Sequence, residues 1–217
     1  MNRANAEPPR ATHRRIGLFG GTFDPPHTGH IALALHVQEK IDLGQVWFIP
    51  SATPPHKTMR TVSPAAIRWE MTCAAIEPFR PGFLASEIEL ERDGLSFTYQ
   101  TVEEIRRLLG REAELFWIIG RDNIVEMPSW MEPHRILKEA TVVAGGRHGV
   151  PMPDSIPDWL AEKLIVLDGP DLDVSSTDIR SKVGQGVIDP ERVPEGVAQI
   201  IKREGLYGYP GTTPLIS

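Results

Sequence analysis

Short apolar segments that stop abruptly limit the folds open to this chain more than any other feature. A run of four or five apolar residues is too short for an ordinary helix, and a strand that is apolar on both sides is typical of a sheet covered on both faces. We therefore predict buried strands at residues 16–19, 46–49, 115–119, 141–144 and 164–167. Residues 83–90 alternate in part and are predicted as a further strand.

Segments with helical spacing of apolar residues lie between these runs. One predicted helix runs from Ser63, as its N-cap, to Ile76. The other predicted helices cover residues 29–40, 98–109, 176–183 and 194–204. This alternation predicts an α/β fold of the Rossmann-like, doubly wound type, with a mainly parallel sheet and helices on both faces. Since ligands of such folds bind beyond the carboxyl ends of the strands, we expect function in the loops that follow them.

Composition excludes several classes of protein. The single cysteine, Cys73, excludes a disulfide framework and a Cys-rich metal site and favours a reducing compartment, so we expect the cytoplasm. No apolar stretch approaches the roughly 20 residues that cross a bilayer. A net charge of −6 argues against general nucleic-acid binding, and neither nucleic acid nor membrane is an expected partner.

We expect a disordered tail at residues 1–13, a single domain over 14–209 and a C-terminal tail at 210–217; the sequence does not indicate an oligomeric state.

The loop after the first predicted strand has the sequence G-G-T-F-D-P-P-H-T-G-H, from Gly20 to His30. Gly20 and Gly21 allow a ligand to approach the backbone closely. His27 and His30 are three residues apart at a helix N-terminus, where backbone amides and the helix dipole favour an anion. These features predict a phosphate site that has donors but no nucleophile. Metal binding by the two histidines is the alternative, although no third ligand is evident.

A second group of donors lies about 150 residues further along the chain. Ser175, Ser176 and Thr177 precede a predicted helix, and Arg180 lies in its first turns. Hydroxyls, N-terminal amides and a guanidinium all donate to phosphate oxygens. An ordinary N-cap beside a surface arginine is the alternative interpretation.

Two further charged residues follow predicted strands. Lys57, in a proline-rich loop, is a mobile cation suited to an anion, or a solvated surface lysine. Asp122 follows Gly120 at the end of the 115–119 run. Its carboxylate is placed to accept hydrogen bonds from ribose hydroxyls, or to cap a helix.

These motifs resemble the signatures of the nucleotidylyltransferase superfamily, and of bacterial nicotinate-nucleotide adenylyltransferases in particular. Residues 20–30 are similar to G-G-T-F-D-P-x-H-x-G-H, and residues 175–180 to S-S-T-x-I-R. Weaker matches are P-P-H-K at 54–57, I-G-x-D at 119–122, S-Y-T-x-x-T at 96–101 and P-x-W at 128–130. The resemblance spans residues 15–207. Met131 and Arg147-His148-Gly149 depart from the family pattern.

The resemblance implies an enzyme of NAD biosynthesis. Such enzymes transfer the adenylyl group of ATP to nicotinate mononucleotide and release pyrophosphate, here by in-line attack without a covalent intermediate. Mg²⁺ is expected on the ATP phosphates, with no metal site formed by side chains. The implied catalytic residues are His27, His30 and Arg180; the implied ATP-binding residues are Gly20, Gly21, Thr22, Phe23, Gly120, Asp122, Ser175, Ser176 and Thr177; those for nicotinate mononucleotide are Lys57, Thr98 and Trp130.

Two rival functions share these motifs, although Trp130 and the P-P-H-K loop favour the pyridine substrate and the intact histidines favour turnover. A related adenylyl- or cytidylyltransferase, such as the phosphopantetheine enzyme, shares the two main signatures. A nucleotide-binding sensor without turnover needs the same loops. The preference for the nicotinate or the nicotinamide mononucleotide turns on a single contact, to a carboxylate or to an amide, that the sequence does not reveal.

Overall fold

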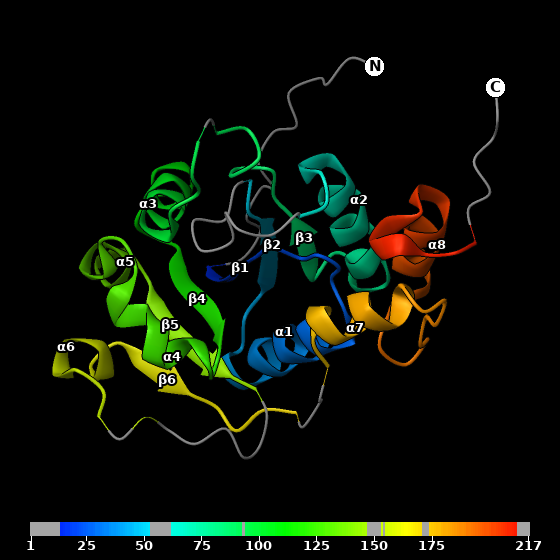
Figure 1. Cartoon of the computed structure of the whole chain (residues 1–217). Helices are drawn as coiled ribbons and strands as arrows, with labels where there is room; N and C mark the ends of the chain where they lie inside the picture. Colours follow the sequence, from blue (N-terminus) through cyan, green and yellow to red (C-terminus); the bar gives the residue numbers. More distant parts are fainter. Residues whose placement is uncertain are drawn as a thin grey trace.

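The fold is built on one twisted, wholly parallel sheet (Figure 1). The structure, a computed structural model, describes residues 14–52, 62–92, 94–146, 153, 155–170 and 174–211. Within them six strands follow the order β3-β2-β1-β4-β5-β6. Their bounds are β1 (Arg15–Gly21), β2 (Gln45–Pro50), β3 (Phe83–Ala85), β4 (Glu114–Gly120), β5 (Thr141–Gly145) and β6 (Leu164–Val166). This order confirms the predicted Rossmann-like fold. Apart from residues 210 and 211, the predicted tails lie outside the described residues.

Eight helices connect the strands within the described residues. They are α1 (Thr28–Ile41), α2 (Ala65–Ile76), α3 (Thr98–Leu109), α4 (Asn123–Glu126), α5 (Pro133–Glu139), α6 (Asp158–Ala161), α7 (Ser176–Val183) and α8 (Glu195–Glu204). Short 3₁₀ turns are η2 (Glu77–Phe79), η3 (Met127–Ser129) and η4 (Leu206–Gly208).

Two local predictions were wrong. β3 ends at Ala85 rather than at Leu90, because the chain turns there and the Leu90 amide donates to the Glu87 carbonyl at 2.7 Å. Ser63 does not cap α2, which begins after Pro64. The Ser63 amide instead lies 3.4 Å from the carboxylate of Asp24, a tertiary partner that local sequence does not reveal.

Alternate side chains of the strands enter two separate hydrophobic cores. Phe48 of β2 and Phe116 of β4 pack with α1, α2, α7 and α8, whereas Trp47 and Trp117 pack with α3, α4, α5 and α6. Both faces of the sheet are therefore covered, as predicted. The chain order reverses between β1 and β4, and in such sheets this reversal leaves a crevice beyond the strand ends.

A buried arginine on α2 holds the two loops that border this crevice. Arg68 is 1% exposed and donates to four backbone carbonyls. Its Nη1 lies 3.0 Å from the Thr22 carbonyl and 2.6 Å from that of Ser51, while Nη2 and Nε reach the carbonyls of Ala52 at 2.9 Å and Ser63 at 3.0 Å. Burial lowers the pKa of the guanidinium. One side chain thus joins the loops after β1 and β2.

Replacing this arginine should destabilise the protein strongly. Arg68→Met preserves much of the buried volume but leaves four carbonyls without their donor, so we expect unfolding to become easier by about 3 kcal/mol or more. Urea denaturation measures the change. The matched control is Arg203→Met, which breaks an exposed two-point contact with Glu70 at 2.6 and 2.8 Å and should move the midpoint far less. Equal shifts of the urea midpoint in the two variants would show that burial does not make Arg68 more important for stability than Arg203.

Candidate active site

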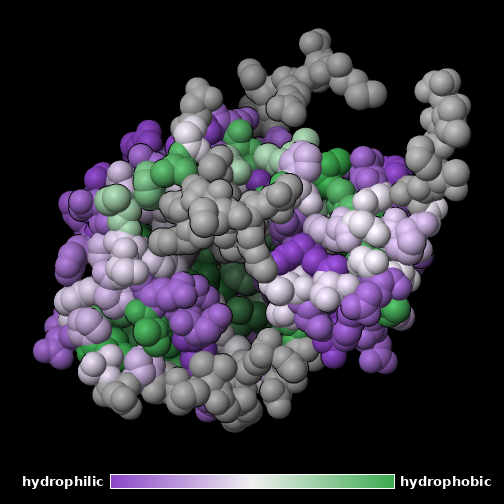
Figure 2. Space-filling model, in the orientation of Figure 1, coloured by the Kyte–Doolittle hydropathy of each residue, from purple (hydrophilic) through white to green (hydrophobic). Residues whose placement is uncertain are grey.

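One cleft of about 890 Å³ lies beyond the carboxyl ends of β1 and β4. Figure 2 shows a hollow near the centre of this face, with hydrophobic residues at its floor. Most of the predicted site residues line the cleft: Gly20, Gly21, Thr22, Phe23, His27, His30, Thr98, Gly120, Asp122, Trp130, Ser175, Ser176, Thr177 and Arg180. Lys57 lies outside the described residues, as do Arg147, His148 and Gly149.

The two histidines form a stacked pair at the start of α1. Their ring centroids are 3.6 Å apart with an interplanar angle of 23°. The Nδ1 atom of His30 accepts a hydrogen bond from the backbone amide of His27 at 3.1 Å. Because Nδ1 accepts, the proton of the neutral His30 ring belongs on Nε2, which is then a hydrogen-bond donor. Phe23 packs edge-on against His30 at 5.1 Å and fixes the ring from another side.

Two glycines of the first loop leave space for aromatic rings. A Cβ atom on Gly29 would lie 3.0 Å from Nδ1 of His27, so a side chain at this position would press against that ring. A Cβ atom on Gly20 would lie 2.6 Å from the indole of Trp117. Gly29 therefore serves close packing beside His27, and Gly20 serves close packing beside Trp117.

The carboxylate of Asp24 ties the first loop to distant parts of the chain. Asp24 is 6% exposed. The Tyr207 hydroxyl donates to its Oδ1 at 2.6 Å, and Arg180 donates to its backbone carbonyl at 2.7 Å. Burial and the hydrogen bond to Asp24 raise the pKa of Tyr207, so its hydroxyl stays protonated as a donor. Sequence reasoning included Asp24 in a motif without giving it a role, and it missed the contact with Tyr207.

The first turn of α7 docks onto the same loop. Ser175 caps the helix, since its Oγ accepts from the Asp178 amide at 3.1 Å. The Ser176 hydroxyl donates to the Pro25 carbonyl at 3.0 Å, and Arg180 donates to the Thr177 hydroxyl at 3.0 Å. The hydroxyls of Ser175 and Thr177 act as acceptors in these bonds, whereas the Ser176 hydroxyl acts as a donor. The capping interpretation of Ser175 is therefore confirmed.

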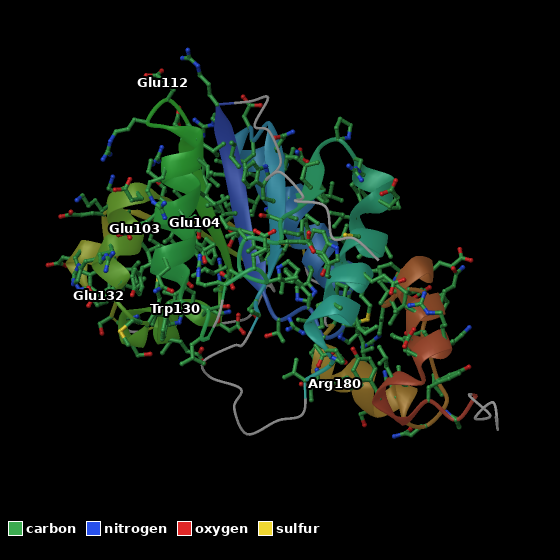
Figure 3. The ribbon with its side chains drawn as sticks, turned by 90° about the horizontal axis from the view of Figure 1, so that it is seen from above. Glu103, Glu104, Glu112, Trp130, Glu132 and Arg180 are labelled. Atoms are coloured by element: carbon green, nitrogen blue, oxygen red, sulfur yellow. The ribbon has the colours of Figure 1, made fainter. Side chains whose placement is uncertain are left out.

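The opposite side of the cleft is formed by the ends of α3 and η3. Trp130 is half-buried, and its amide donates to the Met127 carbonyl at 3.0 Å. Thr98 is the first residue of α3. Asp122 is exposed, precedes α4 without a side-chain capping bond, and accepts from the side chain of Asn123 at 3.1 Å. Trp130 and Arg180 lie on opposite sides of the crevice (Figure 3).

Glu89 is a residue of the cleft that sequence reasoning missed. It is 5% exposed and lines the cleft. Burial raises the pKa of its carboxyl group. Because Glu89 lies between Ile88 and Leu90, an alternating strand would place its side chain in solvent. The chain forms a turn here instead of a strand, and the side chain is buried.

The described part of the chain offers neither a side-chain metal site nor a membrane-spanning helix. The described residues contain no group of three or more His, Cys, Asp or Glu side chains placed to hold a metal ion. Among the described helices, none is long and apolar enough to span a lipid bilayer.

Comparison with known proteins identifies the relatives of this chain. The pattern of the cytidylyltransferase-like family matches residues 18–182. A protein of Dehalococcoides mccartyi named "probable nicotinate-nucleotide adenylyltransferase" is 39% identical over 201 residues, covering 89% of this chain and 97% of that protein. A protein of Thermus thermophilus with the same name is 40% identical over 194 residues, covering 89% and 99%.

A solved structure supports the fold independently of sequence. The nicotinic acid mononucleotide adenylyltransferase of Plasmodium falciparum, complexed with NaAD, superposes with a TM-score of 0.75 at 18% identity, covering 91% of this chain and 98% of that one. The family pattern and the bacterial relatives both extend over most of the chain. The chain therefore belongs to the cytidylyltransferase-like family and, within it, to the nicotinate-nucleotide adenylyltransferases.

Proposed function

We propose that this protein transfers the adenylyl group of ATP to nicotinate mononucleotide, giving deamido-NAD and pyrophosphate. One observation carries the proposal: a single cleft has the stacked histidines and the first turn of α7 on one side, and Trp130 with Thr98 on the other. Phosphate donors thus face a surface suited to an aromatic ring across one continuous space. The names of the bacterial relatives support the same reaction.

The phosphate side of the cleft would bind and polarise ATP. The Nε2 proton of His30 and the His27 ring would stabilise charge on the α-phosphate, and the backbone of residues 20–23, which lines the cleft, would lie beside the phosphates. The remaining N–H groups of Arg180, together with the protons of Ser175 and Thr177, would hold the β- and γ-phosphates. Gly120 and Asp122 would border the adenosine, with the carboxylate accepting from ribose hydroxyls.

The reaction needs no nucleophile from the protein. A phosphate oxygen of the mononucleotide attacks the α-phosphorus in line; a new P–O bond forms as the bond to the β-phosphate oxygen breaks, and pyrophosphate leaves. The protein would accelerate this step by holding both substrates in line and stabilising the developing charge.

The ring side of the cleft would select the mononucleotide. Trp130 offers an indole face to the electron-poor pyridine ring. Thr98, at the N-terminus of α3, would donate to the nicotinate carboxylate, and Lys57 would contact the mononucleotide phosphate. We place the reaction in the cytoplasm, because the lone cysteine favours a reducing compartment.

Any Mg²⁺ in this cleft would arrive bound to the nucleotide, since the phosphates rather than side chains would be its main ligands. No group of three ligating side chains is present within the described residues, so Mg²⁺ would be held mainly by the ATP phosphates and its own waters. When bound, it would neutralise phosphate charge.

A substrate panel followed by pyrophosphate release tests the proposed function. With ATP, we expect the highest kcat/KM for nicotinate mononucleotide, compared with nicotinamide mononucleotide and phosphopantetheine. Highest activity with phosphopantetheine would assign a different transferase, and ATP binding without pyrophosphate release would assign a sensor.

Loss of the His30 ring should slow the chemical step. His30→Ala removes a donor directed at developing phosphate charge, so kcat should fall about 10²- to 10³-fold at saturating substrates. The control is His36→Ala, the same change further along α1 and outside the cleft lining, which should retain kcat near that of the wild type. A near-normal kcat for His30→Ala would contradict the assignment.

Loss of the Trp130 indole should weaken one substrate selectively. Trp130→Ala removes a stacking partner of the ring, so KM for nicotinate mononucleotide should rise about tenfold while KM for ATP changes little. Trp159→Ala is the comparison, because Trp159 packs against His134 outside the cleft lining. A parallel rise of both KM values in Trp130→Ala would argue against ring stacking.

A further inference from the structure

A buried carboxylate lies beside the ring side of the cleft and has no part in the proposed reaction. Glu89 is 5% exposed, lies in the turn after β3, and borders the same cleft as Thr98 and Trp130. Burying a carboxylate costs free energy unless donors surround it. The residues that donate to it therefore indicate what the group does.

Two hydroxyls from the start of α3 meet at this carboxylate. The Thr101 hydroxyl donates to Oε1 of Glu89 at 2.7 Å, and the Ser96 hydroxyl provides a second hydrogen bond. Ser96 and Thr101 stand on either side of Thr98 in the sequence. Glu89 therefore fixes the chain both before and after the residue that we assign to the nicotinate carboxylate.

The other partners of these hydroxyls favour Glu89 as their acceptor, since the Phe97 carbonyl lies farther from the Thr101 hydroxyl, at 3.5 Å. The Ser96 Oγ accepts from the Ala52 amide at 3.1 Å, and the Thr101 Oγ1 accepts from Arg92 at 3.2 Å. With those positions taken by donors, the hydroxyl protons point to the carboxylate. Arg92 also pairs with Glu104 on α3, which extends the network toward the surface.

The first turn of α3 depends on this arrangement because an ordinary cap is missing. Its N-cap residue is Phe97, which has no side-chain oxygen, and no side-chain capping bond forms there. The hydrogen bonds of Ser96 and Thr101 to Glu89 instead connect the chain on both sides of this turn.

We propose that Glu89 is a positioning residue for the mononucleotide: it gathers Ser96 and Thr101 and thereby holds Thr98 and the first turn of α3 at the ring side of the cleft. The inference rests on the proposed function and identifies a residue that positions the binding site for nicotinate mononucleotide. The partners of Glu89 lie beside Thr98, whereas Ser176 and Arg180 of α7 donate to the first loop, so we expect the two substrates to respond differently.

The test is Glu89→Gln in the full-length protein. The amide has one acceptor oxygen where the carboxylate has two, so one hydroxyl loses its partner. KM for nicotinate mononucleotide should rise about tenfold, the effect of losing one hydrogen bond to a charged group, whereas kcat and KM for ATP stay within about twofold.

The matched control is Glu103→Gln. Glu103 lies on α3 and pairs with Arg135 at 2.7 and 2.8 Å, outside the cleft lining (Figure 3). It should leave both KM values unchanged. An equal rise of the mononucleotide KM in both variants, or an unchanged KM in Glu89→Gln, would overturn the proposal. So would a parallel rise of the KM for ATP in Glu89→Gln.

A second variant serves if Glu89→Gln does not fold. Thr101→Val removes one donor to Glu89 at nearly constant volume, and it should again raise only the KM for the mononucleotide; an unchanged KM would overturn the inference. Failure of the two proposals is distinguishable. Wild-type protein that forms no deamido-NAD overturns the proposed function and this inference with it, whereas active Glu89→Gln with normal KM overturns the inference alone.

Discussion

The hydrogen bonds around the buried Asp24 carboxylate are the interactions on which the candidate site depends. A carboxylate at this depth is tolerated only when donors surround it, and its donors come from the amide of Ser63 and the hydroxyl of Tyr207. The carbonyl of the same residue accepts from Arg180. One residue therefore brings the loop after β1, the start of α2, the helix α7 and the C-terminal turn into a single arrangement. The histidine pair follows directly in the sequence and takes its position from this loop.

The two sides of the cleft are held by separate sets of buried polar groups. Asp24 and Arg180 organise the phosphate side, whereas Glu89, Ser96 and Thr101 organise the ring side. Arg68 lies between them, because it donates to the loops after both β1 and β2. This division allows two chemically different ligands to be fixed against each other while each subsite keeps its own supports. Positioning of that kind is the main contribution a protein makes to phosphoryl transfer when it offers no nucleophile.

The sequence predicted the features that are decided locally. Apolar runs located the strands, because a strand that is buried on both faces has apolar residues at nearly every position. The loops at the ends of these strands contained most of the cleft residues. Contacts between distant residues were not predictable in this way. The hydrogen bond from Tyr207 to Asp24 spans 183 positions, and no local pattern links them. Ser63 looked like a helix cap because its tertiary acceptor was unknown. Glu89 looked solvent-facing because its segment alternates like a strand, although the chain turns there.

The contact between Tyr207 and Asp24 has a consequence for the order of events during synthesis. The first loop leaves the ribosome early, but its aspartate receives the Tyr207 hydroxyl only after almost the whole chain has emerged. Arg180 likewise reaches the loop late. A partly made chain can thus form the central strands without completing the phosphate side of the cleft. The nucleotide site that we propose would then be complete only after these late contacts have formed.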